Sequence, residues 1–300
     1  MERFILASCL PYRSAIYRMG GFQAFPNDFL KFYTKEEIET ARIDASRALE
    51  ILEKDKDLRF ISILDERYPA SLRNIYDPPP GLYICGADLD GEFDAIVGTR
   101  APSPVVRCAV RILVRSLSSM IVSGFARGVD AEAHLECARG GRRTIAVLGS
   151  GHRFAGPGST LRLLRPYSDF TTFVSEFPPH WPARSHSFPR RNRIIAGLSA
   201  RVFLMQAPAK SGALITARYA LEEGRDLICF DHPVLETWMN EGARRLIQEG
   251  ATLLEIEALD SLFVRPPGIV WPPGNEQLEF FEKRQRGLLR VSDTLYIEEV

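Results

Sequence analysis

The sequence predicts an α/β fold with a doubly wound, mostly parallel sheet and a small N-terminal helical appendage. From about residue 95 onward, short apolar runs alternate with amphipathic helical stretches, which is typical of βαβ units joined by right-handed crossovers. Gly98, Gly124 and Gly149 each follow one of these runs, where a strand gives way to the next segment. The first 55 residues are instead helical in pattern, aromatic and charged.

The elements of the sheet follow from the apolar runs taken in chain order. The expected strands are 94–97, 120–122, 144–148, 172–174, 200–205 and 227–230, with 252–254 as a last edge strand. The expected helices are 105–117, 130–138, 213–223 and 243–248. In the first of them, Val106, Val110, Leu113 and Leu117 recur at helical spacing. Ligands of such sheets bind beyond the carboxyl ends of the strands, where glycine lets the backbone approach closely.

The ends of the chain differ from this core. Thr34 and Glu37 have the spacing of a capping box that starts a helix, and residues 76–81 form a proline-rich turn leading into the core. Two Pro-Pro-Gly segments, 265–268 and 271–274, read as linkers, and a helix is expected near 276–289. The predicted division is therefore an appendage over 1–55, a core over 56–255 and a tail over 256–300.

Composition limits the class of protein. The chain has 38 Lys and Arg residues against 38 Asp and Glu residues, and its apolar content is that of an ordinary globular protein. No apolar run is long enough to span a membrane, and no signal peptide is visible. Five cysteines without a CxxC pair predict reduced thiols in a cytoplasmic protein, with no metal and no cofactor.

The charges are distributed unevenly along the chain. Neither 138–168 nor 177–221 contains an Asp or Glu residue. The cations in the two windows are Arg139, Arg142, Arg143, Arg153, Arg162 and Arg165, and then Arg184, Arg190, Arg191, Arg193, Arg201, Lys210 and Arg218. A neutral chain with this pattern presents one positive face, and the natural partner of such a face is a polyanion.

Two of four informative segments follow the first strands. Gly98-Thr99-Arg100 ends the first strand, and the alternative interpretation is an ordinary turn with Arg100 in solvent. The second segment runs from Ser123 to Asp130 and contains Gly124, Arg127 and Gly128. It lacks the G-x-G-x-x-G dinucleotide fingerprint. Asp130 and His134 lie on one helix face, where helix capping and structural hydrogen bonding are favoured over a catalytic or metal pair.

The third segment, 188–199, begins an apolar helix with Arg190, Arg191, Asn192 and Arg193. Cations at a helix N-terminus are repelled by the positive end of the helix dipole. A phosphate bound there would instead interact favourably with both the dipole and the guanidinium groups. Arg190 and Arg193 share a helix face and are expected to flank one phosphate. Arg191 is expected on a neighbouring phosphate or on a carboxylate such as Glu176, and Asn192 is expected to tie the loop to the core.

The fourth segment is Lys210-Ser211-Gly212, which starts a helix with Thr216 one turn further on. Free N–H groups and two hydroxyls in one place suit a phosphate or a ribose. The alternative interpretation is that Ser211 is a plain helix cap without any ligand.

Together these segments resemble the DNA-processing protein A family, also called Smf. The resemblance covers about 61–254, and its most specific parts are the FPxRNRIIAGLS and SGALITA segments. It implies an extended Rossmann-like domain that binds single-stranded DNA, forms a homodimer and loads a RecA-type recombinase during natural transformation. It implies no enzymatic activity. The expected DNA contacts are Gly98, Thr99, Arg100, Ser123, Gly124, Arg127, Gly128, Arg190, Arg191, Asn192, Arg193, Lys210, Ser211, Gly212 and Thr216.

The chain also departs from the family pattern. Residues 156–160 replace a tyrosine-proline, a lysine and an asparagine, so a lysine that the family uses for DNA contact is missing. Residues 231–234 replace a proline-glycine, and 102–105 replace a turn glycine. Many members end in a winged-helix domain, and the tail here shows no complete one.

Two other functions remain open from the sequence. One is a nucleotide-processing enzyme of the related lysine-decarboxylase-like group, a nucleoside-monophosphate glycosidase. The PGGxGT loop of that group is absent here. Residues 209–213 occupy the comparable position and do not match that motif. Such an enzyme would need a positioned carboxylate, for which Glu176 and Glu222 are candidates. The other is a pure protein-interaction scaffold, which the acid-free arginine windows disfavour.

Overall fold

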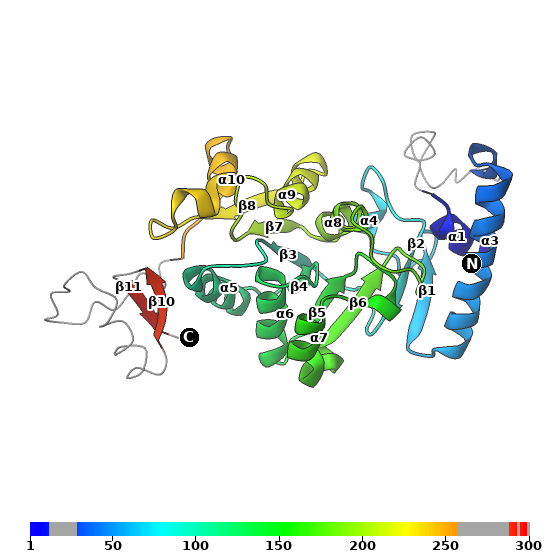
Figure 1. Ribbon diagram of the computed structural model, residues 1–300, viewed down its shortest axis with the longest axis horizontal. Coiled ribbons are helices and arrows are strands. Elements are labelled where there is room, and N and C mark those ends of the chain that lie inside the picture. The colour runs from blue at the N-terminus through cyan, green and yellow to red at the C-terminus, as the bar shows by residue number, and fades with distance from the viewer. Residues whose placement is uncertain (12–28, 257–287, 293–294, 299–300) are drawn as a thin grey trace, which may run out of the picture.

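A nine-stranded sheet forms the centre of the molecule (Figure 1). The computed structural model describes residues 1–11, 29–256, 288–292 and 295–298. In spatial order the strands are β1 (Leu58–Ser62), β2 (Gly81–Cys85), β6 (Thr171–Ser175), β5 (Thr144–Val147), β4 (Met120–Ser123), β3 (Phe93–Val97), β7 (Arg201–Leu204), β8 (Asp226–Phe230) and β9 (Thr252–Leu254). A separate antiparallel hairpin contains β10 (Leu288–Ser292) and β11 (Leu295–Glu298).

The chain reverses its direction of travel across the sheet at β3. It passes from β3 through β4 and β5 to β6 on one side, and then returns to β7 on the other side of β3. Every pairing from β6 to β9 is parallel, with Ala95 of β3 opposite both Val122 of β4 and Val202 of β7. The carboxyl ends of β3 and β7 therefore border a topological switch point, where such sheets bind their ligands.

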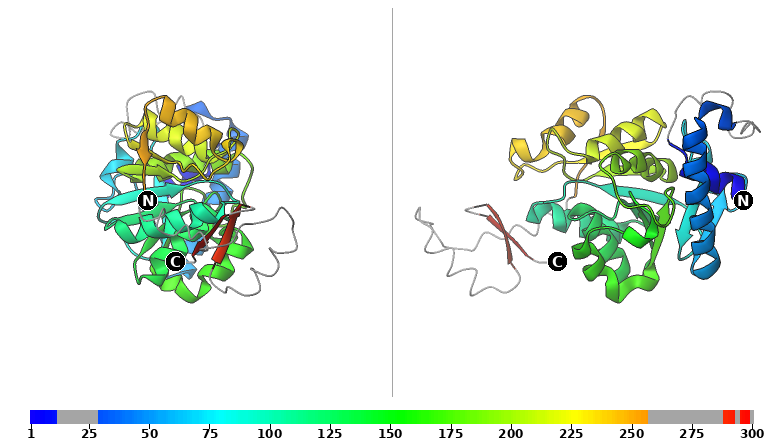
Figure 2. Two further views of the ribbon diagram at one scale, coloured as in Figure 1. Left: turned by 90° about the vertical axis from the view of Figure 1, so that its left-hand side faces the viewer. Right: turned by 45° about the vertical axis from the view of Figure 1, so that its right-hand side comes forward.

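Helices cover both faces of the sheet (Figures 1 and 2). One face carries α5 (Pro104–Ser116), α6 (Val129–Arg139) and α7 (Gly158–Leu164). The other carries α4 (Ala70–Arg73), α8 (Ser187–Leu198), α9 (Ala213–Glu222) and α10 (Thr237–Gln248). Short 3-10 helices occur at Phe29–Phe32, His152–Phe154 and Arg165–Phe170.

The alternating direction of side chains along each strand explains why helices pack on both faces of the sheet. Ile96 of β3 packs with α5 and α6, whereas its neighbours Ala95 and Val97 pack in the cluster that includes α8 and α9. Successive side chains of a strand point to opposite faces, so a strand buried on both faces must be apolar throughout. The continuous apolar runs in the sequence reflect this burial.

The N-terminal elements pack beside β1 and β2 (Figure 2). Helix α3 (Lys35–Lys54) begins with the predicted capping box, because Thr34 Oγ1 accepts from Glu37 N and Glu37 Oε2 accepts from Thr34 N. Its small buried residues face α1 (Glu2–Cys9). Ser8 of α1 is in hydrogen-bond contact with the Tyr83 hydroxyl of β2 at 3.0 Å, which joins the appendage to the sheet.

The predicted α/β class, the parallel strands and the helices between them are confirmed, with small shifts in their ends. Helix α10 begins at Thr237, earlier than the predicted 243. The antiparallel strands β1 and β2 were not predicted, nor was the hairpin. Most of the helix expected at 276–289, with both linkers, lies outside the described residues. Its last two residues, Leu288 and Leu289, belong to β10, so the helix prediction is wrong there.

The five cysteines lie mostly in the interior of the fold. Each of the five cysteines is a thiol and not half of a disulfide, and all but the half-buried Cys85 are buried. Within the part of the chain that the structure describes, no cluster of metal-ligating side chains occurs. No helix there is long and apolar enough to cross a membrane.

Candidate nucleic-acid interface

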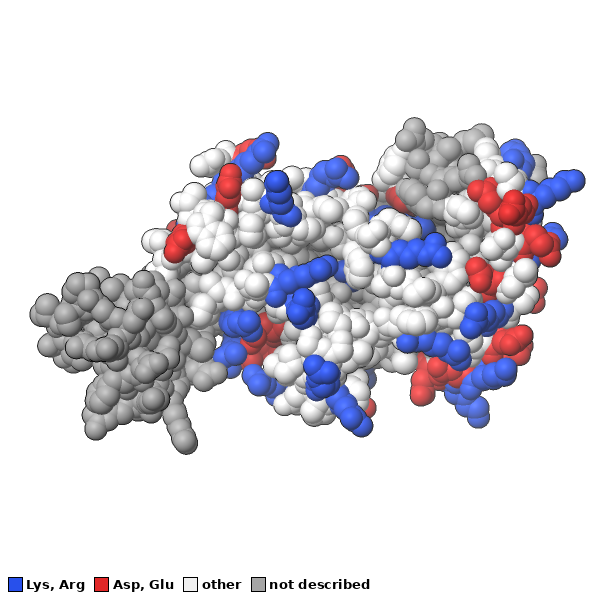
Figure 3. Space-filling view, in the orientation of Figure 1, with Lys and Arg blue, Asp and Glu red and all other residues white. Residues whose placement is uncertain are grey.

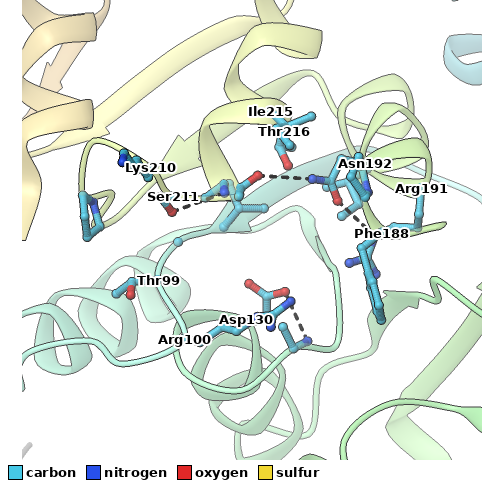
Figure 4. A pocket seen from close by; sticks show the side chains of 18 of the residues that line it. Thr99, Arg100, Asp130, Phe188, Arg191, Asn192, Lys210, Ser211, Ile215 and Thr216 are labelled. Atoms are coloured by element: carbon cyan, nitrogen blue, oxygen red, sulfur yellow. Dashed lines mark hydrogen bonds between the residues drawn. The ribbon is translucent and has the colours of Figure 1, made fainter. Parts of the chain in front are cut away.

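A cavity of about 770 Å³ opens at the switch point, between the loops that follow β3 and β7 and the start of α8 (Figure 4). Its lining residues are Val97, Gly98, Thr99, Arg100, Ala126, Asp130, Ser185, Phe188, Pro189, Arg191, Asn192, Ile195, Pro208, Lys210, Ser211, Gly212, Ala213, Ile215 and Thr216. The middle of the same face shows Lys and Arg side chains, while Asp and Glu gather mainly at the α3 end (Figure 3).

The loop after β3 brings Arg100 to the cavity. Thr99 N donates to Gln206 O at 2.8 Å, and Val129 N donates to Thr99 O at 3.2 Å. Gly128 has a φ of +83°, and a Cβ there would lie 2.4 Å from Thr99 O, so glycine is required for the two loops to pack together. Arg100 is exposed, and its guanidinium lies 6.0 Å from the centre of the Phe188 ring. This arrangement is a cation–π contact.

The start of α9 forms the opposite side of the cavity. Gly212 precedes the helix with φ −62°, and a Cβ placed there would have no neighbour within 4 Å. Ser211 Oγ accepts a hydrogen bond from Ala213 N at 3.3 Å, and Lys210 is exposed. Exposed Lys210 and the positive end of the α9 dipole both belong to the cavity lining, and each stabilises an anion. Thr216 is buried in the cavity wall.

Arg191 lines the cavity as a buried residue and is not in solvent. It is 5% exposed, and its Nη1 donates to Gly124 O at 2.6 Å and to Val147 O. Burial lowers the pKa of Arg191 to about 10 although Asp130 opposes the shift, so the group is charged at neutral pH. The expected contact between Arg191 and Glu176 is wrong, because Arg191 points to the loop after β4 instead.

Asp130 holds that same loop. Its Oδ2 accepts from Gly124 N at 3.1 Å and from Ala126 N at 3.2 Å. Burial raises the pKa of Asp130, while Arg191 and the two amides oppose the rise. A Cβ on Gly124 would lie 2.6 Å from Arg191 Nη2 and 2.7 Å from Asp130 Oδ2. The helix-capping role expected for Asp130 is wrong, because Gly128 occupies the N-cap of α6 and Asp130 bonds the preceding loop.

Arg190 and Arg193 do share a helix face, but that face meets a carboxylate. Arg193 donates to Glu176 at 2.6 and 2.7 Å and also contacts Asp77, and Arg190 Nη2 lies 2.8 Å from Glu176 Oε2. Burial alone would raise the pKa of Glu176, but the two arginines outweigh it and hold the pKa below its ordinary value. The expected single phosphate between Arg190 and Arg193 is therefore replaced by an acid of the protein itself.

Asn192 links the two helices that border the cavity. Its Oδ1 accepts from Arg191 Nε at 3.1 Å, and its Nδ2 donates to Gly212 O at 3.4 Å (Figure 4). This agrees with the expected tie to the core.

His134 is buried against Thr144 at 2.7 Å, and burial lowers the pKa of His134 to about 3. It is a neutral core residue, as the structural interpretation expected.

Nine of the fifteen predicted contact residues line the cavity: Gly98, Thr99, Arg100, Arg191, Asn192, Lys210, Ser211, Gly212 and Thr216. The other six do not: Ser123, Gly124, Arg127, Gly128, Arg190 and Arg193. Ser123 is buried and donates to Ile96 O at 2.6 Å. Phe188, which is 38% exposed, was missed. Its signal was present, because an aromatic residue beside several arginines is typical of single-strand binding surfaces.

The carboxylates suggested for an enzyme do not lie in this cavity. Glu176 is buried with Arg190 and Arg193. Glu222 is exposed and lies 3.3 Å from Arg218. Asp130 is the carboxylate among the lining residues, and it accepts two backbone hydrogen bonds. The arrangement thus offers cations, a helix N-terminus and an aromatic ring to a ligand.

Comparison with known proteins identifies the family of this chain. The sequence model of DNA recombination-mediator protein A matches residues 59–263. The chain belongs to this family. Protein Smf of Synechocystis is 38% identical to this chain over 248 residues, which cover 79% of this chain and 61% of that protein. DNA processing protein DprA of Streptococcus pneumoniae is 39% identical over 198 residues, which cover 64% of this chain and 70% of that protein.

Solved structures of the family share the fold. DNA processing protein A from Streptococcus pneumoniae superimposes with a TM-score of 0.71 and 30% identity, covering 84% of this chain and 93% of that one. The Helicobacter pylori protein, whose structure was described for its single-stranded DNA binding mode, gives a TM-score of 0.59 and 28% identity, covering 65% of this chain and 90% of that one. The extended Rossmann-like fold expected from the sequence is thus confirmed.

Proposed function

We propose that this protein binds single-stranded DNA in the switch-point cavity and acts as a recombination mediator without catalytic turnover. The observation that carries the proposal is the convergence of Arg100, Lys210 and the N-terminus of α9 on one cavity. Within the described residues, neither Arg100 nor Lys210 forms an ion pair with a carboxylate. Cations that the protein leaves unneutralised are available to phosphates.

The cavity suits a nucleotide better than a phosphate alone. Val97, Ile195 and Ile215 give it an apolar floor, and the exposed Phe188 ring stands at its edge. In this proposal a base stacks on Phe188 while Arg100 leaves the ring for the adjacent phosphate. Stacking on an aromatic side chain is tolerant of sequence and requires an unpaired base, which favours single strands over duplex.

We also propose that the protein loads a RecA-type recombinase onto the single-stranded DNA that it binds. The family description, recombination mediator, supports the transfer of bound strands to a RecA-type recombinase. We propose that the protein acts as a homodimer in the cytoplasm, that residues 56–255 form the DNA-binding unit and that 1–55 form a helical appendage. Sedimentation of the full chain and strand-exchange assays with a RecA-type protein test the dimer and the loading.

The binding experiment compares a labelled 20-residue thymidine oligomer with a duplex of equal length by fluorescence anisotropy. We expect tighter binding to the single strand, and a loss of at least about tenfold for Arg100→Ala with Lys210→Ala, because each charge-assisted contact is worth about 1.5–3 kcal/mol. Arg139→Ala with Arg143→Ala is the matched control, since both arginines are exposed and lie at the opposite edge of the sheet.

Two results would contradict the proposal. One is equal or stronger binding to duplex DNA. The other is hydrolysis of nucleoside monophosphates by the purified protein, which would favour the glycosidase alternative and direct attention to Asp130.

A further inference from the structure

Asp44 joins the N-terminal appendage to the loop between β6 and α8, the helix that carries Phe188. Its two carboxylate oxygens meet two consecutive residues of this loop. Asp44 Oδ1 lies 3.0 Å from His180 Nε2, and Asp44 Oδ2 accepts from Trp181 Nε1 at 3.1 Å. His180 is buried and Trp181 is half-buried. These contacts connect residues 136 and 137 positions apart, so they hold α3 against the loop.

The same loop packs on the segment after β5, which also supports the Phe188 ring. Gly151 N donates to Trp181 O at 2.8 Å. Two residues earlier, Gly149 lies against Phe188 at the cavity (Figure 4), because a Cβ on Gly149 would lie 2.7 Å from Phe188 Cδ1. The loop that Asp44 holds and the ring that faces the cavity therefore rest on one short stretch of backbone, 149–151.

The loop changes from buried to exposed at Trp181. Residues 178–180 are buried, whereas 182–186 are exposed and lead into α8. Ser185, in the exposed half, lines the cavity. The guanidinium of Arg184, also in that half, lies 6.0 Å from the centre of the Trp181 ring. A shift of Trp181 would therefore move the part of the loop that reaches the cavity.

We propose that Asp44 is a positioning residue for DNA binding: through His180 and Trp181 it keeps Phe188 in the orientation in which a base stacks on it. This inference rests on the proposed function of the cavity and gives the N-terminal appendage a part in that function. A binding group that is already held in place loses less conformational freedom when the ligand binds, so the affinity is higher. Charge alone predicts the reverse, because removal of a carboxylate lowers the repulsion of a polyanion.

Asp44→Ala and Trp181→Phe remove the same hydrogen bond from its two sides. Each is expected to weaken binding of the labelled single-stranded thymidine oligomer by at least about threefold, since part of the stacking on Phe188 is lost. The slope of log K against log salt should stay the same, because no phosphate contact is removed. In a Phe188→Ala background, Asp44→Ala should cause no further loss of affinity, whereas a general loosening of the fold would still weaken binding.

Ser8→Ala is the matched control, because it removes a different bond of the appendage, the one to the Tyr83 hydroxyl of β2. It should leave the affinity for DNA unchanged. Amide hydrogen exchange of the full chain without DNA gives a second readout. In Asp44→Ala, but not in Ser8→Ala, the amides of 149–154 and 182–190 should exchange faster, because the loop and its support open more often.

Unchanged or tighter DNA binding by Asp44→Ala would overturn the inference, and so would an equal loss in Ser8→Ala or a full further loss in the Phe188→Ala background. Unchanged exchange over the two segments would also overturn it. If Arg100→Ala with Lys210→Ala weakens binding and Asp44→Ala does not, the positioning role is wrong and the cavity stands. If the wild-type protein binds no single strand, the proposed function fails and this inference fails with it.

Discussion

The guanidinium of Arg193 and the carboxylate of Glu176 form a two-pronged ion pair, with Nη1–Oε1 at 2.6 Å and Nη2–Oε2 at 2.7 Å. Both side chains are at most 3% exposed. The pair joins the start of α8 to the segment after β6, so it fixes the helix that carries Phe188 and Arg191. The arginine-rich segment thus combines structural groups with groups that face the cavity.

Glu176→Gln is expected to lower the free energy of unfolding by about 3–5 kcal/mol at neutral pH, because Arg193 and Arg190 lose the buried carboxylate that they share and Asp77 is left as the carboxylate beside Arg193. Urea denaturation measures the loss. The pKa of Glu176 in the fold is below its ordinary value of 4.5, so the stabilisation is complete above that pH and is lost as the pH falls through the folded pKa. The difference between wild type and variant should shrink below about pH 4.5. A difference that grows in acid would contradict this assignment.

Arg100→Ala should weaken binding of single-stranded DNA by about tenfold or more and leave the melting temperature unchanged, because Arg100 is exposed and bonded to no carboxylate in the described structure. Arg100→Lys should retain part of the affinity, since it keeps the charge but loses the planar guanidinium. Anisotropy and thermal melting give the two readouts. Unchanged affinity for Arg100→Ala would mean that Arg100 is only a solvated turn residue.

Arg191 and Asp130 are expected to be energetically coupled through the loop at Gly124. Arg191→Met and Asp130→Asn should each destabilise the fold, because each leaves a buried charge without its opposite charge. The double variant should be less destabilised than the sum of the two, with a coupling of about 0.5–3 kcal/mol. A double-mutant cycle by urea denaturation measures the coupling. Strict additivity would show that the two groups do not stabilise each other.

Two glycine substitutions separate the fold from the cavity. Gly212→Ala places a methyl group in open space at an ordinary helical φ, so stability should be unchanged or slightly higher. The methyl group would occupy the approach of a phosphate to the α9 N-terminus, so affinity should fall several-fold.

Gly124→Ala is the contrasting variant. Its Cβ would lie under 3 Å from both Arg191 and Asp130, so we expect a clear loss of stability.

If Gly212→Ala binds DNA as well as wild type does, the phosphate does not sit on the start of α9.

The sequence predicted the parts of the fold that depend on local pattern. Apolar runs buried on both faces mark β3 to β8, and the capping box at Thr34 marks the start of α3. It did not predict β1 and β2, because they are held by antiparallel pairing, and β2 pairs with the distant strand β6. Such pairing leaves little trace in a short run of residues beside a proline-rich turn.

In the candidate site, too, features that depend on local pattern were predicted and those that depend on distant residues were not. Gly98, Thr99 and Arg100 at the end of β3 and the start of α9 were predicted and line the cavity, because a doubly wound sheet places ligands there. The separate roles of Arg190, Arg191 and Arg193 were not, because their neighbours come from elsewhere in the chain. Arg193 bonds Glu176 from 17 residues away and Asp77 from 116 residues away. Sequence spacing gave the shared face of Arg190 and Arg193 but not what that face meets.

The most direct test of the central claim is the affinity for single-stranded DNA measured over a salt series. If the cavity and its surroundings neutralise about five phosphates, log K should fall against log salt with a slope near −3.5, at roughly −0.7 per phosphate. Arg100→Ala should reduce the magnitude of that slope by about 0.7. A flat salt response, or a slope that Arg100→Ala leaves unchanged, would contradict a phosphate-binding cavity at the switch point.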